Sequence, residues 1–167
     1  MDPQVIDEAL IRATVDRARV STRGRTNYNF HSGPAENPHR FLNVLMRGSY
    51  VAPHRHVTPP KSETFLVLEG LLALFCFHDD GSVQSVHLLG NARGVPLPEH
   101  WRKLPVGRGI DLPAGIWHTV TAVSEYAACL EVKPGPWDAA TDKEFAAWAP
   151  KEGDSAAAEY LERLLQG

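Results

Sequence analysis

The 167-residue sequence has little of three features that mark specialised classes of protein. Its only cysteines, Cys76 and Cys129, both lie inside apolar runs, so neither a disulfide framework nor a thiolate zinc site is expected. No apolar run approaches the roughly 20 residues that a membrane span needs. Positive charge is not in excess, because the formal net charge is −3. We therefore expect neither a membrane partner nor a nucleic-acid partner.

What remains is the composition of an ordinary globular domain, with 43% hydrophobic and 22% charged residues. A chain of this length buries roughly 68–70% of its unfolded surface as one domain. The N-terminus lacks the features of a targeting segment, which favours a cytoplasmic location. Eight histidines are the unusual count. With so few cysteines, any bound metal is expected to use imidazole and carboxylate ligands.

Helical patterns flank the middle of the chain. Asp2 and Pro3 predict a helix start, and apolar residues recur at helical spacing after them. Near the other end, Thr141 and Glu144 have the spacing of a capping box, which predicts a helix start there. Residues 156–165 repeat apolar positions at helical spacing and predict a final helix.

Between the helical ends, short apolar runs alternate with glycine and proline. This pattern is typical of an all-β sandwich or barrel. The predicted strands are 41–46, 49–52, 64–68, 71–77, 83–89, 110–112, 119–123 and 127–132.

The chain is thus interpreted as a single domain, 1–167, of the mainly-β class. Residues 1–39 are assigned to an N-terminal helix and lead-in segment, 40–133 to the barrel, and 134–167 to a C-terminal helical extension. Residues 90–106, rich in glycine and proline, interrupt the strand pattern and are interpreted as a surface insertion of unassigned role.

A first chemical motif contains His54, Arg55 and His56, followed after six residues by Glu63. Side chains two apart on a strand share a face, so both histidines can point into the barrel while Arg55 points away. The turn at Pro59 brings the chain back, so that Glu63 can face the same interior. The alternative for Glu63 is an exposed charge at a strand edge.

A second motif places a Pro113–Gly115 turn shortly before His118. With His54, His56 and Glu63, His118 completes a set of three imidazoles and one carboxylate. These donors suit one divalent transition metal such as Fe, Mn, Ni, Zn or Cu, and they suit Ca or Mg poorly. An octahedral metal held by four protein ligands would keep two positions for water or substrate.

Both motifs resemble the two conserved motifs of the cupin superfamily, G(X)5HXH(X)3–4E(X)6G and G(X)5PXG(X)2H(X)3N. The chain departs from them in two places. Six residues separate His56 from Glu63, and Ala122 stands where the second motif has asparagine. The resemblance implies a single cupin jelly-roll β-barrel that binds a metal.

Further segments are similar to WbuC-type cupin fold metalloproteins and extend the resemblance over nearly the whole chain. The matching stretches are 27–31, 53–56, 113–118, 131–136 and 148–150. That family is associated with bacterial surface-polysaccharide (O-antigen) gene clusters and has no settled reaction. The resemblance therefore implies fold and metal more firmly than activity, and it also implies a homodimer formed through β-strands.

Substrate recognition is assigned to Tyr28, His31, Lys61 and Trp117, and no catalytic residue is assigned. Residues 27–31 can form a strand across the barrel mouth, or they can serve only turns and backbone hydrogen bonds. Trp117 can equally be a packing anchor. Substrate is expected to arrive near the 90–106 insertion. The remaining histidines are interpreted as ordinary: His39, His78, His87 and His100.

Three functions follow for a small-molecule substrate or ligand. The first is a small metalloenzyme, such as an isomerase or oxygenase, acting on a sugar-related or other small polar substrate. The second is a non-catalytic metal-dependent binding or sensing module. The third is a metal-independent sugar epimerase, which has no need for a complete ligand set. Fold analogy alone does not choose among them.

Overall fold

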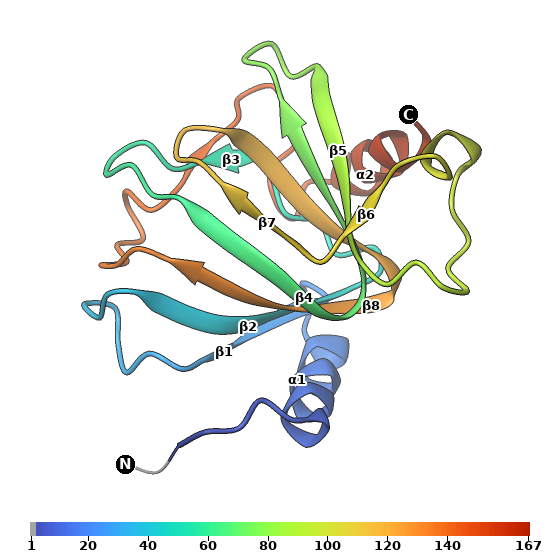
Figure 1. The fold of residues 1–167 in the computed structure, drawn as a ribbon. Helices are drawn as coiled ribbons and strands as arrows, with labels where there is room; N and C mark the ends of the chain where they lie inside the picture. The colour runs from blue at the N-terminus through green and yellow to red at the C-terminus, as the bar shows by residue number, and fades with distance from the viewer. Residues whose placement is uncertain (1–2) are drawn as a thin grey trace.

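Two helices frame a β-sheet in the computed structural model of the protein, which describes residues 3–167 (Figure 1). The helices are α1 (Glu8–Val20) and α2 (Ala157–Gln166), and a short 3-10 helix is η1 (Glu99–Trp101). The strands are β1 (Arg25–Asn29), β2 (His39–Met46), β3 (His54–Arg55), β4 (Glu63–Phe77), β5 (Val83–Gly90), β6 (Val106–Gly107), β7 (Gly109–Leu112), β8 (Trp117–Lys133) and β9 (Glu144–Phe145). The prediction of a mainly-β domain with flanking helices is confirmed.

The long strands β4 and β8 bend, so that each contributes to two layers of a sandwich. In the first layer, β1, β2, the second half of β8, the first half of β4 and β7 pair in that order. In the second layer, β3 pairs with the first half of β8, which pairs with the second half of β4, followed by β5 and β6. The register between β4 and β8 shifts around Gly70, where the layers diverge.

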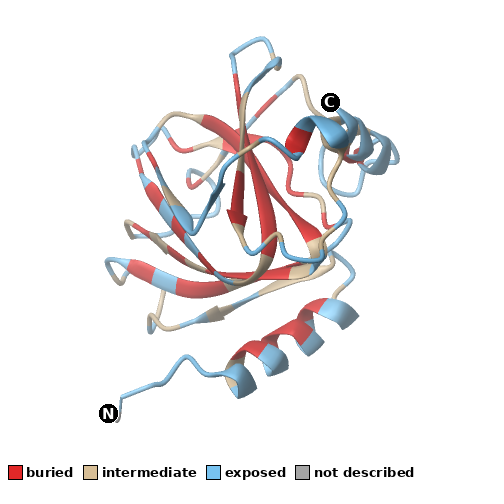
Figure 2. Cartoon of the chain, turned by 45° about the vertical axis from the view of Figure 1, so that its right-hand side comes forward, coloured by how far each residue is buried: buried red, intermediate tan, exposed pale blue. Residues whose placement is uncertain are grey.

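Alternation along β4 decides which side chains lie between the layers. Leu72 and Leu74 point inward and join the central apolar cluster, whereas Leu71 and Phe75 belong to a second cluster on the outer face. All four are completely buried, because the outer face of the second layer is also covered. Figure 2 shows this continuous burial along the central strands.

Three segments cover the outer faces of the sandwich. On the first layer, α1 buries Ile11 and Val15 against Leu42 and Val44 of β2. On the second layer, the 90–106 segment and α2 pack against the outer cluster. The 90–106 segment is therefore a packed covering element, and its Trp101 is only 2% exposed.

Several predicted boundaries are wrong. α1 begins at Glu8, and its N-cap is Asp7, whose side chain accepts a hydrogen bond from the Leu10 amide. The Asp2 cap lies outside the described residues. The predicted strand 49–52 has no strand structure.

The capping-box prediction at Thr141 and Glu144 is also wrong. Glu144 opens the two-residue strand β9, which pairs with β3, and no helix begins there among the described residues. A two-residue spacing pattern is weak, and sheet pairing overrides it at this position.

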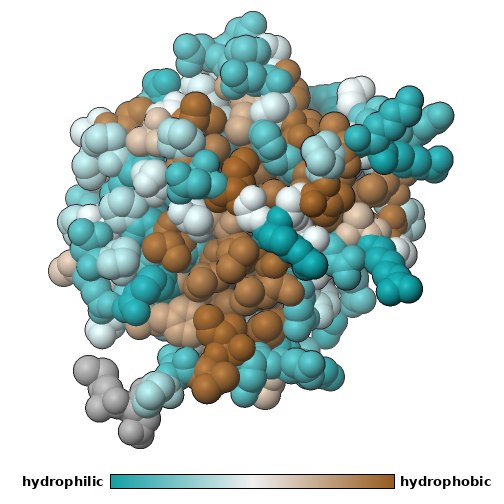
Figure 3. Space-filling view, viewed as in Figure 1, coloured by the Kyte–Doolittle hydropathy of each residue, from teal (hydrophilic) through white to brown (hydrophobic). Residues whose placement is uncertain are grey.

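The surface of the first layer carries exposed apolar residues. Leu66 and Leu68 of β4 alternate with the inward-facing Phe65 and Val67, and they are 44% and 38% exposed. Figure 3 shows apolar area near the middle of this face of the molecule. Within residues 3–167, none of the helices has both the length and the apolar character that crossing a bilayer requires.

We expect Trp101→Ala to lower the free energy of unfolding by about 3–5 kcal/mol, because it empties a site in the outer cluster beside Phe75. Urea denaturation followed by circular dichroism measures this change. Trp137→Ala is the matched control, since Trp137 is 46% exposed and its loss should cost much less. Equal effects of the two substitutions would contradict the packed role of the 90–106 segment.

Candidate metal centre and cavity

Strand pairing brings the histidines of the two motifs together. His54 of β3 lies opposite His118 of β8 in the register of the sheet. Glu63 is the first residue of β4, and His56 follows β3 directly. All four side chains are buried, with relative exposures of 1–3%. The paired strands therefore bring residues up to 64 positions apart in sequence into one cluster.

The turn before His118 depends on a glycine. Gly115 has φ +84°, a conformation that L side chains rarely adopt, and its amide donates to the carbonyl of His56 at 3.1 Å. This bond ties the second motif to the first, next to the cluster. The proline–glycine spacing of the motif thus has a direct structural reason.

Backbone carbonyls fix the orientation of all three imidazoles. Nδ1 of His54 donates to the carbonyl of Ala52 at 3.0 Å, and Nδ1 of His118 donates to the carbonyl two residues before it at 2.9 Å. Nδ1 of His56 donates to the carbonyl of Asp142. With the proton on Nδ1, each ring presents the unprotonated Nε2 as a ligand atom, which is the usual arrangement of metal-binding histidines.

The Glu63 carboxylate faces these nitrogens at close range. Its Oε1 lies 3.1 Å from Nε2 of His56, and its Oε2 lies 2.9 Å from Nε2 of His118. Despite these distances, both Nε2 atoms and Oε2 are buried without a hydrogen bond of acceptable geometry. Two acceptors held this close in a buried site repel each other unless a proton or a metal ion lies between them.

The distances fit a metal ion in that place. The ligand atoms of His54, His56, Glu63 and His118 all lie within 4.8 Å of one another. Opposite donors on one transition metal are about 4.2 Å apart, given bonds of about 2.1 Å. A contraction of a few tenths of an ångström would close the site. These four buried residues can therefore hold a metal ion as a set of three nitrogens and one oxygen.

The charge states of the cluster favour metal binding. Burial lowers the pKa of His54 well below its usual value, helped by the nearby Lys143 and His118. Although burial alone would raise the pKa of Glu63, pairing with His118 and His56 holds it well below its usual range. Metal ligands have to be deprotonated, and these shifts supply a neutral imidazole and an ionised carboxylate.

A line of buried opposite charges runs outward from the cluster. Lys133 Nζ lies 3.7 Å from Glu63 Oε1 and 3.0 Å from Asp142 Oδ2. Lys61 Nζ lies 2.8 Å from the other oxygen of Asp142. Burial tends to raise the pKa of Asp142, but Lys133 and Lys61 lower it. Asp142 therefore stays ionised, and its backbone carbonyl also orients His56.

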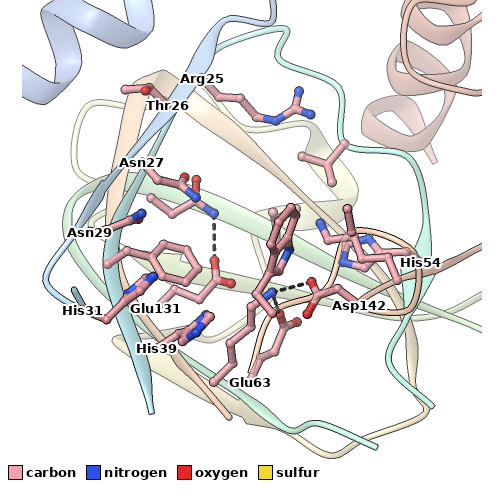
Figure 4. A pocket seen from close by; sticks show the side chains of 18 of the residues that line it. Arg25, Thr26, Asn27, Asn29, His31, His39, His54, Glu63, Glu131 and Asp142 are labelled. Atoms are coloured by element: carbon pink, nitrogen blue, oxygen red, sulfur yellow. Dashed lines mark hydrogen bonds and ion pairs between the residues drawn. The ribbon is translucent and has the colours of Figure 1, made fainter. Parts of the chain in front are cut away.

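The cluster opens onto a cavity of about 620 Å³ between the layers. One end holds His54, His118 and Glu63, and β1 and β2 line the opposite side (Figure 4). Alternate residues of the two strands and of the loop between them point inward. These are Arg25, Asn27, Asn29, His31, His39, Phe41 and Asn43.

A second buried carboxyl group, Glu131, also lines this cavity. Its Oε2 accepts a hydrogen bond from Nδ2 of Asn43 at 2.8 Å, marked by a dashed line in Figure 4. Burial, together with the negative charge of Glu63, raises the pKa of Glu131 to about 8. This side chain is therefore mostly protonated at neutral pH. Because Oε2 accepts from the amide, the proton belongs on Oε1.

Lys143 enters the cavity from the 137–145 segment, which follows the barrel and ends in β9. Within residues 3–167 its ammonium group has neither a hydrogen bond nor an ion pair to another side chain. Burial and repulsion by Lys133 lower its pKa, although Glu63 and Glu131 counter the shift.

The structure brings only one of the four predicted substrate residues into the cavity wall. His31 lines the cavity and stacks on His39, with ring centroids 4.1 Å apart. Tyr28 points to the other face of β1, against the cluster under α1. Lys61 is occupied by Asp142 and by the carbonyl of Pro136 at 2.5 Å.

Trp117 also lies away from the cavity. Its Nε1 donates to Asp79 at 2.9 Å, and the Arg55 guanidinium lies 4.2 Å from its ring centroid. Arg55 pairs with Glu144 as well, so alternation points it outward as the sequence predicts. The 90–106 segment, near which the sequence predicts substrate entry, supplies none of the described residues of the cavity wall.

Sequence reasoning missed several cavity residues: Asn43, Glu131, Lys133, His39, Asp142 and Lys143. A signal existed for the first three, since Asn43 interrupts an apolar strand and Glu131 and Lys133 share a face of β8 with Cys129. The same parity rule places Tyr28 on the face opposite Asn27 and Asn29. No local signal points to Lys143, because it reaches the cavity only where the 137–145 segment folds back over the barrel.

Comparison with known proteins then places the chain in a family. A family model described as Domain of unknown function (DUF6016) matches residues 6–89, just over half of the chain. The chain belongs to the DUF6016 family. The matched part of this DUF6016 chain contains His54, His56 and Glu63, and it ends before His118. No curated protein matches it.

Solved structures similar to the DUF6016 chain include capsular polysaccharide assembling protein CapF from Staphylococcus aureus, with a TM-score of 0.52 and 18% identity. The match covers 75% of this chain and 30% of CapF, so the chain spans about a third of that protein. TT1209 from Thermus thermophilus has a TM-score of 0.52 and 18% identity, over 81% of this chain and 98% of its own.

Protein SO0799 from Shewanella oneidensis has a TM-score of 0.53 and 11% identity, over 75% of each chain. At these identities the likeness concerns the fold alone. Together with the buried histidine–glutamate cluster, it supports a cupin-like fold for the DUF6016 chain.

We expect His118→Ala and His54→Ala to abolish metal binding, because each removes one of four converging donors. Elemental analysis of protein purified without added metal should show about one ion per chain in the wild type and almost none in either variant. His87→Ala is the control, since His87 bonds Ser85 and is not among the cluster residues. Full occupancy in the His118 variant would refute the ligand assignment.

Glu131→Gln should change how stability depends on pH. The unfolded carboxyl loses its proton near 4.5, whereas the folded one keeps it to about 8. The folded state therefore binds more protons in this window, so Glu131 lowers the free energy of unfolding as pH rises, by about 1.4 kcal/mol per pH unit. Glutamine keeps the Asn43 bond and removes this loss.

The stability of Glu131→Gln relative to the wild type should consequently increase across that window. Urea denaturation of chelated protein at several pH values measures this, because a bound cation would itself lower the pKa of Glu131. Glu162→Gln, on the exposed face of α2, is the control and should track the wild type. A constant difference between Glu131→Gln and the wild type would contradict the buried, neutral state of Glu131.

Proposed function

We propose that the protein is a mononuclear metal-dependent enzyme that acts on a small polar substrate inside the barrel. One observation carries the proposal. Unprotonated Nε2 atoms, fixed by backbone carbonyls, converge on the Glu63 carboxylate at the end of a polar cavity. A purely structural histidine cluster would have no reason to adjoin a cavity of about 620 Å³.

His54, His56, Glu63 and His118 are the proposed ligands of one divalent transition metal, with Fe, Mn, Ni and Zn as candidates. A metal bound there would supply Lewis acidity and would lower the pKa of bound water. The supporting contacts are in place for this role, because each imidazole is oriented by a carbonyl.

Glu131 is the proposed proton carrier of the site. Without a metal the side chain is mostly neutral near pH 7, and its Oε1 is free to donate because Asn43 occupies Oε2. A bound metal would favour the ionised form, in which the same carboxylate can accept a proton. A buried group whose pKa lies close to the working pH suits general acid–base catalysis. Asn27 and Asn29 on the facing wall can orient substrate hydroxyl groups by hydrogen bonds.

The 137–145 segment encloses the reaction space. The Asp142 carboxylate binds Lys61 and Lys133, and the Ala146 amide donates to the carbonyl of Pro53 at 2.9 Å. These bonds hold the segment beside the cluster, where it limits access of water. Trp137 of this segment lines the cavity and is 46% exposed, so it lies toward the mouth.

Two alternatives remain from the sequence. A non-catalytic metal-dependent binding module would use the same ligands, but it would not need a neutral carboxyl group beside them. A metal-independent epimerase would use a histidine as base, yet the Nε2 atoms of His56 and His118 would then both face one carboxylate with no cation between them. Glu131 is the observation that favours an enzyme over a binder.

The proposed biological role follows from the resemblance of the sequence motifs to WbuC-type proteins. A WbuC-type role in bacterial surface-polysaccharide biosynthesis, on a sugar-related substrate, is proposed from the motif pattern. CapF, a capsular polysaccharide assembling protein with a similar fold, is consistent with it. Isomerase and oxygenase chemistry both fit an open metal site, and the identity of the metal would favour one of them.

We expect the metal-loaded protein to convert at least one member of a panel of small sugars, sugar phosphates and sugar acids. Proton NMR in deuterium oxide, with and without oxygen, would follow loss of substrate signals and exchange of protons. His118→Ala should abolish conversion by removing the metal. Glu131→Gln should keep the metal and slow conversion about 100-fold or more, as expected for loss of a group that donates or accepts a proton.

The same experiment separates the alternatives. Line broadening of a ligand that is never converted would indicate a binding module. Proton exchange that persists after removal of the metal by chelation would indicate the epimerase. Conversion at the wild-type rate by His118→Ala would overturn the metal-dependent proposal.

A further inference from the structure

The walls of the cavity carry four basic and four acidic residues. Its four basic residues are Arg23, Arg25, Lys133 and Lys143. The acidic residues are Glu63, Asp142, Glu152 and Glu131, and the last of these is mostly neutral at pH 7. A divalent metal on the ligand cluster would make the cavity more positive.

Two of the basic residues already have partners. Arg25 pairs with Glu152 at 2.5 Å, and Lys133 lies between Asp142 and Glu63. Arg23 lies exposed at the rim of the cavity. Lys143 is different, because its half-buried side chain lines the cavity and its ammonium group pairs with no carboxylate within residues 3–167.

The position of Lys143 is fixed from both sides. Asp142, just before it, forms buried ion pairs with Lys61 and Lys133. Glu144 and Phe145, just after it, pair with β3, and Phe145 lies opposite His54. The backbone of Lys143 is thus held beside β3, which carries the proposed ligand His54.

Even a partly desolvated ammonium group without a partner is costly. Burial lowers the pKa of Lys143, because the charged form loses solvation there. No ion pair joins Glu63 to Lys143 within residues 3–167, and the lysine nearest to this carboxylate is Lys133 at 3.7 Å. An anion entering the cavity would remove the cost by pairing with Lys143.

We propose that the cavity takes a small molecule with a carboxylate or phosphate group, and that Lys143 Nζ forms an ion pair with that group. This inference deepens the proposed function, since it rests on the same cavity and names the class of substrate. Asn27, Asn29 and His31 on the opposite wall would then contact the uncharged part of the molecule. Lys143 is accordingly a specificity-determining residue.

The test compares three probes of similar size: glucose, glucuronate and glucose 6-phosphate, with inorganic phosphate as a minimal anion. Isothermal titration calorimetry of the metal-loaded wild type should show binding of at least one anion and weaker binding of glucose. The two anionic sugars distinguish a carboxylate site from a phosphate site. Elemental analysis of each sample reports its metal content independently.

Lys143→Met should weaken binding of the preferred anion about tenfold or more, while metal content stays at the wild-type level. Lys143→Arg should retain most of the affinity because it keeps the charge. Lys151→Met, at an exposed position of the same C-terminal region, is the control and should bind as the wild type does. Lys143→Gln replaces the Met variant if the latter fails to fold.

Several outcomes would overturn the proposal. These are equal anion affinity in Lys143→Met and wild type, binding of glucose as tight as binding of the anions, and absence of binding by every anion. Failure of the metal site is distinguishable from these results. It would appear as a wild type without metal, in which loss of anion affinity on Lys143→Met could still be measured.

Discussion

The candidate site depends on electrostatic repulsion between buried acceptor atoms. The fold holds these atoms close together, and a bound cation would relieve the repulsion. Carbonyl groups hold the Nδ1 protons of three imidazoles, so that the Nε2 lone pairs of two of them face the Glu63 carboxylate at about 3 Å. The strand register, the turn at Gly115 and the return of the 137–145 segment all serve to bring these acceptors together. Such a cluster is costly when empty, and the same geometry allows it to hold a metal ion.

The buried charges around the cluster also depend on one another. Glu63, Lys133, Asp142 and Lys61 alternate in sign, and all four are buried. Removing one member would leave its neighbour as an uncompensated buried charge, at a cost of about 3–5 kcal/mol. The backbone carbonyl of Asp142 also accepts the hydrogen bond that orients His56. The 137–145 segment is therefore connected directly to the proposed ligands.

Features that follow from the alternation of side chains along a strand could be predicted from the sequence. Contacts made where a later segment folds back over the barrel could not. The grouping of His54, His56 and Glu63, the proposed ligands, follows from strand parity and motif spacing, as does the outward orientation of Arg55. Parity would also have placed Tyr28 outside and Glu131 inside, had it been applied to β1 and the end of β8. Lys143 had no such signal, since its place depends on β9 pairing with β3.

Two titratable groups of the cavity, Glu131 and Lys143, lie outside the set of proposed metal ligands. Desolvation raises the pKa of Glu131 and lowers that of Lys143, so both tend toward their neutral forms. An anion beside Lys143 would favour its protonated form, whereas a metal on the cluster would favour ionised Glu131. Binding of anion and of metal would therefore move protons in opposite directions, and a cavity holding both would contain a proton donor, Lys143, and a proton acceptor, Glu131.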